Sequence, residues 1–183
     1  IGLPSPVRLE RWQAGRLRPV EGALLLSGGA LTTHVQAFAH KLTDAIYTYG
    51  CESSTWIPGH GPKLKAVVFD ASDLQHTDQL KQLREFFQPL LKNLQNSAHL
   101  VILGRAPESL DDPFAASAQR ALEGFSRSLA KELRNGGVLQ LLYVGEGAED
   151  QLEGALRFFL SPKSAYISGQ VIRLDACATP VED

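Results

Sequence analysis

The chain lacks several features that would assign it to a specialised class of protein. It has 183 residues, no methionine, and only two cysteines, Cys51 and Cys177. The cysteines are too few and too far apart for a metal site, and scarce cysteine favours a reducing compartment. There is no charged and apolar leader of the secretory type. We therefore expect a cytoplasmic protein and interpret the sequence as a piece of a longer polypeptide.

The chain also has no excess of positive charge and no long hydrophobic segment. It has 18 Lys and Arg against 20 Asp and Glu, a formal charge of -2, so we expect no nucleic-acid partner. The longest apolar stretch runs from Val138 to Val144 and is interrupted by Gln140. A bilayer span needs roughly 20 apolar residues, so we expect no membrane insertion. The 44% hydrophobic content is enough for the core of a single domain.

Short apolar runs alternate with segments of helical periodicity, a pattern typical of βα units. The sequence predicts a three-layer α/β domain with a doubly wound, mainly parallel sheet of five or six strands, Rossmann-like or flavodoxin-like. The expected strands cover residues 23–26, 65–69, 99–103, 138–144 and 170–174, with a weaker candidate at 45–49.

Three helices are expected between these strands. One follows an apolar stripe from Leu80 to Leu94 and should be kinked or loosened by Pro89. A second spans about 113–134, capped by Asp111 or Asp112 and ended by Gly136. The third carries apolar residues from 152 to 160.

The predicted organisation has three parts. Residues 1–21, with three prolines, form an N-terminal arm or short helix packed on a neighbour. Residues 22–176 form the α/β domain, and 177–183 form a linker toward a further domain.

In an open α/β sheet, ligands bind outside the carboxyl ends of the strands. The turn from Ser27 to His34 follows a strand and opens a helix, so Ser27, Gly28 and Gly29 are weak candidates for binding a cofactor. A dinucleotide turn needs further glycines, yet Thr32 and His34 occupy those places, and the alternative is a plain strand-to-helix turn. Asp70, at another strand end, is either a ligand-binding acid or the cap of the next turn.

Other polar residues have ordinary alternatives. The five histidines show no metal-ligand spacing, so we expect no metal site. Arg105 follows a strand and faces either a phosphate-bearing ligand or a surface acid. The loop 56–62 is either a contact loop or an irregular crossover.

Two segments carry a resemblance to a known family. Residues 114–133 (FAASAQRALEGFSRSLAKEL) resemble the active-site helix of short-chain dehydrogenases/reductases. Residues 158–172 (FFLSPKSAYISGQVI) are similar to the family's closing helix and strand. The resemblance spans roughly residues 22–176. It implies that a strand, a helix and the adenosine-binding acid are missing between Gly28 and Lys65, and FMN is not expected either.

The resemblance also implies that the catalytic groups are absent. The family reduces carbonyls with a nicotinamide cofactor, using a tyrosine as proton donor and a lysine four residues later. Phe114 and Ala118 stand at these positions. The family's catalytic serine normally follows the preceding strand, but no serine stands directly after residues 99–103, and Ser109 is a poor substitute. Asn93 lies too far along its helix to replace the family's catalytic asparagine. We therefore expect no catalytic residue and no cofactor in this segment.

A more specific resemblance is to the N-terminal, flavodoxin-type domain of high-molecular-weight 3-oxoacyl-[acyl-carrier-protein] reductases. It is carried by Gly2-Leu3-Pro4, residues 68–71 (VFDA), Glu85-Phe86-Phe87 and Ser164-Ala165-Tyr166. It implies a parent enzyme of fatty acid metabolism whose second domain reduces 3-oxoacyl thioesters with NADH or NADPH. The implied role of this segment is structural, with its own C-terminal reductase domain and further copies of the chain in a homo-oligomer as partners. The alternative is a nucleotide-binding oxidoreductase or regulatory domain with an atypical site.

Overall fold

The computed structural model describes residues 7–50 and 55–176. The strands are β1 (Ala23–Gly28), β2 (Ala45–Tyr49), β3 (Leu64–Asp70), β4 (Leu94–Gly104), β5 (Val138–Val144) and β6 (Gln170–Leu174). The α-helices are α1 (Leu31–Leu42), α2 (Lys81–Leu90), α3 (Pro113–Glu132) and α4 (Leu152–Phe159). Short 3-10 turns are η1 (Thr77–Leu80), η2 (Leu91–Asn93), η3 (Pro107–Ser109), η4 (Glu149–Gln151) and η5 (Pro162–Ser164).

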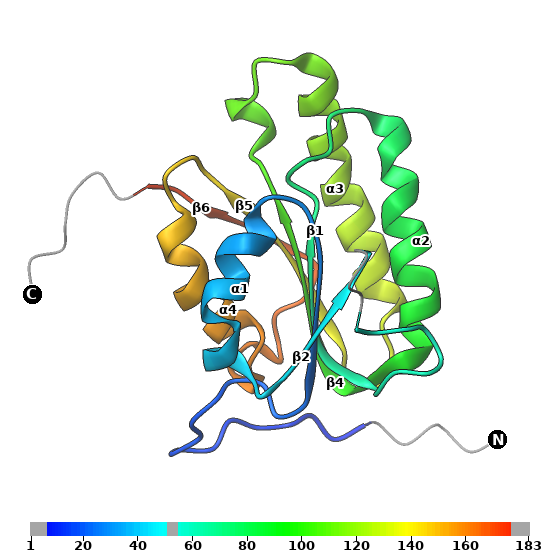
Figure 1. Ribbon diagram of the computed structural model, residues 1–183, viewed down its shortest axis with the longest axis vertical. Coiled ribbons are helices and arrows are strands. Elements are labelled where there is room, and N and C mark those ends of the chain that lie inside the picture. The colour runs from blue at the N-terminus through cyan, green and yellow to red at the C-terminus, as the bar shows by residue number, and fades with distance from the viewer. Residues whose placement is uncertain (1–6, 51–54, 177–183) are drawn as a thin grey trace, which may run out of the picture.

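The described strands form one sheet in the order β2-β1-β3-β4-β5-β6, with every neighbouring pair parallel. Helices α1 and α4 cover one face, and α2 and α3 cover the other (Figure 1). The predicted three-layer, Rossmann-like α/β fold is therefore confirmed, including the weaker strand candidate at 45–49. After β1 the chain adds β2 on one side of it, and then adds β3 and the later strands on the other side. The carboxyl ends of β1 and β3 therefore form the switch point where such folds bind ligands.

The core follows from the composition of the strands. Every residue of β3 and β5 is buried, as expected for parallel strands covered on both faces. One apolar cluster lies under α2 and α3, and a second lies under α1 and α4. Alternate residues of each strand contribute to the two clusters, because successive side chains point to opposite faces.

The sheet is narrow on the side of β2. Between Gly28 and Lys65 the described residues contain one helix, α1, and one strand, β2, which lies at the edge of the sheet. The chain returns to β3 through a loop anchored by Trp56, whose buried indole Nε1 donates to the Pro62 carbonyl over 3.1 Å. Of the two interpretations of loop 56–62, a crossover that packs on its own domain fits this arrangement. The family resemblance also makes Glu52 a distant candidate for the adenosine-binding acid, with a solvated loop residue as the alternative. Glu52 lies outside the described residues.

The helix boundaries agree with the sequence patterns in part. Asp112 caps α3 by accepting from the backbone N–H groups of Phe114 and Ala115. The helix ends at Glu132, before the expected Gly136, which instead has a φ of 73° in the turn into β5.

The stripe from Leu80 to Leu94 does not form one helix. Helix α2 ends at Leu90, one residue after Pro89, and Leu94 already begins β4. Proline removes a helical N–H and disfavours further turns. Asn93 donates its side-chain amide to the Pro89 carbonyl over 3.0 Å, so it caps this helix end rather than facing a site.

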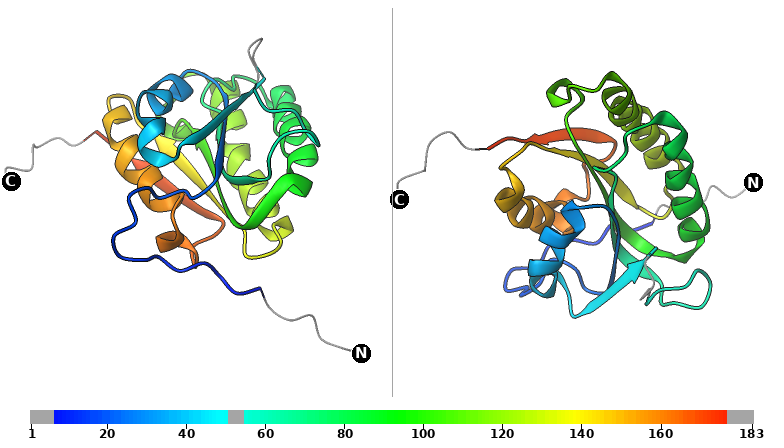
Figure 2. Two further views of the ribbon diagram at one scale, coloured as in Figure 1. Left: turned by 60° about the horizontal axis from the view of Figure 1, so that its bottom comes forward. Right: turned by 45° about the horizontal axis from the view of Figure 1, so that its top comes forward.

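The described part of the N-terminal arm crosses the edge formed by the amino ends of the strands (Figure 2). Residues 7–20 contain no helix or strand. Glu10 holds the arm in place through Lys65 at 2.5 Å and Arg16 at 2.8 Å. Burial alone would raise the pKa of Glu10, but hydrogen bonds from Lys65 and Arg16 outweigh it and lower that pKa. The arm therefore packs on its own domain. The predicted linker, 177–183, lies outside the described residues.

No helix among the described residues has the length and apolar character needed to cross a membrane.

Candidate functional site

The switch point brings the turn after β1 against the end of β3. Gly28 has a φ of 114°, and a Cβ there would lie 2.1 Å from the Asp70 carbonyl oxygen. A Cβ on Gly29 would lie 2.2 Å from Oδ2 of Asp73. Both glycines are needed for close approach, as in a phosphate-binding turn, but the group that approaches is the chain's own backbone and carboxylate.

Two carboxylates occupy the amino end of α1, where an anionic ligand would bind. Oδ2 of Asp70 accepts from the Thr32 backbone N–H over 2.8 Å, and its Oδ1 accepts from the Ser72 N–H over 3.0 Å. Oδ2 of Asp73 accepts from the Ala30 N–H over 3.0 Å. Free N–H groups and the helix dipole make such a terminus an anion site. Here two of those groups, the N–H groups of Ala30 and Thr32, already have carboxylate partners, and Asp70 is only 3% exposed.

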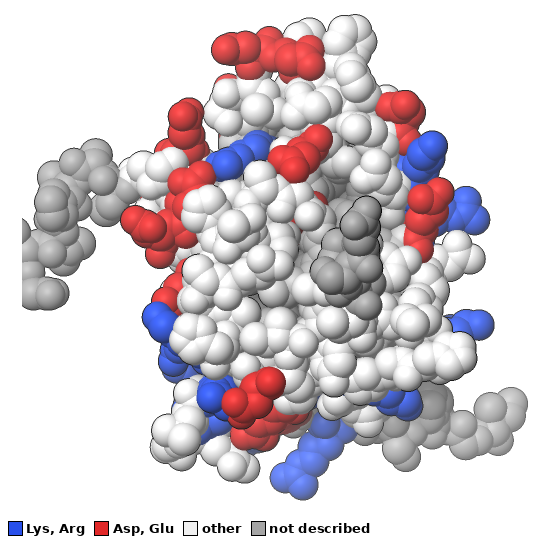
Figure 3. All heavy atoms as spheres, viewed as in Figure 1, with Lys and Arg blue, Asp and Glu red and all other residues white. Residues whose placement is uncertain are grey.

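The wider surface around this edge is acidic. On the face shown in Figure 3, Asp and Glu side chains predominate at the upper end, where the strands terminate. These negative charges repel a phosphate that approaches this edge. The phosphate would also have to displace the carboxylates of Asp70 and Asp73.

The two positions of the family's proton donor and lysine point in different directions. Phe114, in the first turn of α3, is 67% exposed, and its ring lies 6.0 Å from the imidazole of His76. Ala118 is 0% exposed and belongs to the core under α2 and α3. A phenyl ring has no proton to donate and a methyl group has no charge, so this pair supplies neither acid nor ribose-binding ammonium.

A buried glutamine, which the sequence analysis did not single out, connects the strand ends on this side. Gln119 is completely buried, and its Oε1 accepts from the Arg105 N–H over 2.9 Å. Its Nε2 donates to the Ala71 carbonyl over 2.8 Å. Gln119 therefore bridges the segments after β3 and β4. Its only sequence signal is a polar residue next to Ala118 on the buried face of a helix.

Tyr143 is the buried hydroxyl nearest to this arrangement. It donates to the Gln119 carbonyl over 2.7 Å, and burial raises its pKa to about 12. Its proton is therefore already used in an internal hydrogen bond and is retained at neutral pH. Tyr143 does not replace the missing proton donor at Phe114.

The remaining candidates after β4 also have internal partners. Arg105 pairs with Glu149 at 3.1 Å and donates to the Val144 carbonyl at 2.9 Å, which agrees with the ion-pair alternative. The Ser109 hydroxyl donates to the Ala106 carbonyl over 2.8 Å. Within residues 7–50 and 55–176 no group of three His, Cys, Asp or Glu is arranged to hold a metal ion.

A small cavity of about 260 Å³ lies beside the turn that follows β1. Ser27 and Gly28 line it together with the rings of Tyr49, Phe69 and Phe86. This is below the roughly 300–1,000 Å³ of ordinary ligand sites. Of the predicted cofactor-binding residues, the structure thus brings Ser27, Gly28, Gly29 and Asp70 to one edge, but packs them against one another.

The sequence matches no protein family profile and no curated protein. Solved structures with the same fold include the enoyl-[acyl-carrier-protein] reductase (NADH) of Aquifex aeolicus VF5, with 14% identity and a TM-score of 0.67 over 85% of this chain and 96% of that one. A short-chain dehydrogenase/reductase of Serratia marcescens has 14% identity and a TM-score of 0.63 over 86% and 98%. BdcA of E. coli has 14% identity and a TM-score of 0.63 over 85% and 99%. The chain therefore has the fold of short-chain dehydrogenases/reductases.

Proposed function

We propose that this chain is a non-catalytic structural domain of a cytoplasmic 3-oxoacyl-[acyl-carrier-protein] reductase. In this proposal a following domain of the same polypeptide reduces 3-oxoacyl thioesters to 3-hydroxyacyl thioesters with NADH or NADPH. The present segment binds no cofactor and contributes to the assembly of a homo-oligomer.

The observation that carries this proposal is the occupation of the α1 terminus by Asp70 and Asp73. The carboxylate oxygens of these two residues accept from the N–H groups of Thr32 and Ala30, which a pyrophosphate would need. A fold that keeps a strand-to-helix turn at this position but fills it with its own carboxylates retains the framework without the cofactor. The residues at the proton-donor and lysine positions, Phe114 and Ala118, support the same conclusion.

The parent activity rests on the sequence resemblance, and the fold is compatible with it.

Contacts with the reductase domain or another copy need exposed apolar side chains. The stripe of α3 formed by Leu122 and Leu129 is buried inside the domain. The exposed aromatic side chains of these two segments are Phe114 on α3 and, in the closing segment, Phe158 on α4 and Tyr166, which is 83% exposed.

Calorimetric titration of the chain with NADH, NADPH and FMN tests the missing cofactor site. We expect no heat of binding beyond dilution. A dissociation constant in the low micromolar range for any of them would overturn the non-catalytic assignment and favour a nucleotide-binding oxidoreductase or regulatory domain.

Deleting residues 1–183 from the full polypeptide tests the structural role. We expect the truncated protein to change its mass in light scattering or its melting temperature, while a folded reductase domain still reduces an acetoacetyl thioester. Unchanged mass and melting temperature would contradict an assembly role. Lost activity in a truncation that remains folded and correctly assembled would show a direct catalytic contribution.

A further inference from the structure

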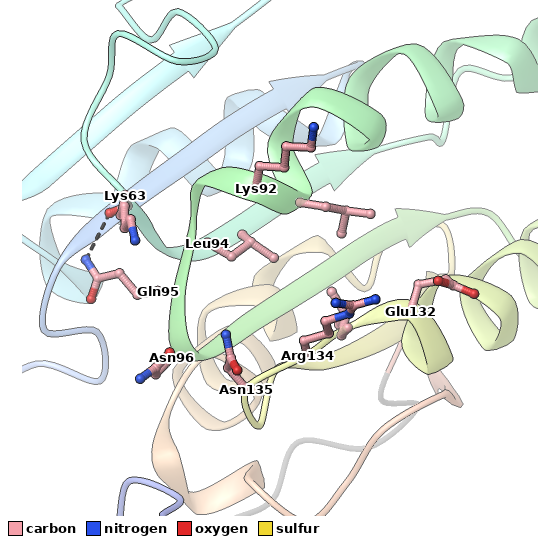
Figure 4. Close-up of a pocket in the computed structure, with 10 residues that line it drawn as sticks. Lys63, Lys92, Leu94, Gln95, Asn96, Glu132, Arg134 and Asn135 are labelled. Carbon is pink, nitrogen blue, oxygen red and sulfur yellow. Dashed lines mark hydrogen bonds between the residues drawn. The ribbon is translucent and has the colours of Figure 1, made fainter. Parts of the chain in front are cut away.

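A groove of about 860 Å³ lies at the edge of the sheet opposite the amino end of α1 (Figure 4). Its walls are η2 with the start of β4 on one side and the carboxyl end of α3 on the other. Neither wall takes part in the emptied cofactor site, so the groove is independent of the function proposed above.

Three cations from three separate segments surround the groove. Lys63 precedes β3, Lys92 lies in η2, and Arg134 follows α3. None of them forms an ion pair with a carboxylate of the described residues. Glu132 is the one acidic residue of the lining, so the groove carries a net positive charge on a chain whose formal charge is -2. Helix dipoles favour Lys92 and Arg134 at these helix ends, but this reason does not apply to Lys63.

The groove also has an apolar floor and a fixed shape. Leu91, Leu94 and Leu133 line it and are half-buried, and Figure 4 shows Leu94 among the three cations. The backbone N–H of Ser97 donates to the Asn135 carbonyl over 2.8 Å, which ties the two walls together. Both residues have positive φ, 51° and 55°, a conformation that side chains other than glycine rarely adopt. This hydrogen bond fixes the two walls of the groove relative to one another.

We propose that this groove docks an acidic peptide segment of a partner protein. Carboxylates of the segment pair with Lys63, Lys92 and Arg134, and an apolar side chain between them packs on the leucine floor. The groove is open to solvent and its charges are on long side chains, whereas a small-molecule site encloses most of its ligand. Three cations are also few for a nucleic acid, which binds through many phosphate contacts.

The test uses a fluorescein-labelled peptide rich in glutamate and leucine, titrated with the chain at low ionic strength and followed by fluorescence anisotropy. The same peptide with glutamine in place of every glutamate is the ligand control. The protein variant is Lys92→Gln with Arg134→Gln. Its matched control is Lys81→Gln with Arg84→Gln, which removes one lysine and one arginine from exposed positions of α2.

We expect saturable binding of the acidic peptide that added salt weakens, and about tenfold weaker binding by the groove variant. The α2 control should bind like the wild type. Circular dichroism should show that both variants are folded, as expected for substitutions of solvated side chains.

Four results of the binding experiment would overturn the proposal, and a fifth would come from self-association. The four are no saturable binding by the wild type, equal binding of the glutamine peptide, an equal loss in the α2 control, and tighter binding of a single-stranded oligonucleotide than of the acidic peptide. Concentration-dependent self-association that the groove variant abolishes would assign the groove to a second copy of this chain and would also reject it.

Discussion

Replacing Asp70 with alanine tests whether the carboxylates at α1 are structural. The substitution removes the carboxylate acceptor of two buried N–H groups, those of Thr32 and Ser72, and leaves the Thr32 N–H only the Gly29 carbonyl at 3.2 Å. Losing a helix-capping side chain costs about 0.5–2 kcal/mol, and a hydrogen bond to a charged group contributes about 1.5–3 kcal/mol. Because the two effects overlap at Thr32, we expect the free energy of unfolding to fall by about 3 kcal/mol.

Two further variants separate charge from geometry. Asp70→Asn removes the charge near the helix terminus and keeps one acceptor oxygen, but its side-chain NH2 then faces one of the two backbone N–H groups. It should therefore cost about 2 kcal/mol. Asp73→Ala removes one exposed hydrogen bond to Ala30 and should cost about 0.5 kcal/mol. Urea denaturation with a constant m-value measures all three. Equal costs for Asp70→Ala and Asp73→Ala, or a cost below about 1 kcal/mol for Asp70→Ala, would refute the reasoning.

Added pyrophosphate supplies a second, independent readout. In the wild type the carboxylates occupy the terminus, so pyrophosphate should not raise the urea midpoint. In Asp70→Ala the Thr32 N–H loses its carboxylate partner and keeps only the Gly29 carbonyl at 3.2 Å. Pyrophosphate binding to the folded state should then raise the midpoint. An equal rise in the wild type would show that an anion site is open despite Asp70 and Asp73.

Three other predictions address buried groups. His99 is 1% exposed, and burial lowers its pKa to about 4, so it stays neutral in the fold while the unfolded chain is protonated below 6.5. Stability should therefore fall by up to about 3 kcal/mol as pH drops from 6.5 toward 4, and His99→Asn should flatten this dependence in urea titrations; an unchanged slope would contradict it. The double variant Phe114→Tyr with Ala118→Lys should show no reduction of an acetoacetyl thioester and should lose several kcal/mol of stability, since the lysine would be buried; turnover above the buffer blank would disprove this. Tyr143→Phe removes a buried hydrogen bond to Gln119 and should cost about 1 kcal/mol by thermal unfolding, and a stabilised variant would contradict it.

Local sequence patterns were enough to predict the layers of this fold. The central strands, such as β3 and β5, are short apolar runs covered on both faces, so their composition indicates their burial. The cap of α3 was also predictable, because Asp112 needs only its own following residues. The pattern failed where one apolar stripe crossed a boundary. Leu94 continues the helical spacing of α2 but belongs to β4. Pro89 indicated that the helix would be kinked or loosened, but the apolar spacing does not show where the strand begins.

For the candidate site, the sequence predicted only which reactive groups are absent from particular positions. The residues Phe114 and Ala118 carry no reactive group in any fold, so the sequence excludes them as acid and base. What occupies the site instead was not predictable, because Asp70 and Thr32 are 38 residues apart and meet only when β3 lies beside β1.

The sequence by itself therefore determined the α/β class. It also excludes Phe114 and Ala118 as a proton donor and a cation, since both conclusions depend on residue type and short spacing. Only the tertiary structure decided that Asp70 and Asp73 fill the α1 terminus, that Gln119 bridges two strand ends, and that Lys63 and Arg134 face one groove. These contacts join segments far apart in the chain. Their geometry follows from strand order and helix packing, which no local pattern encodes.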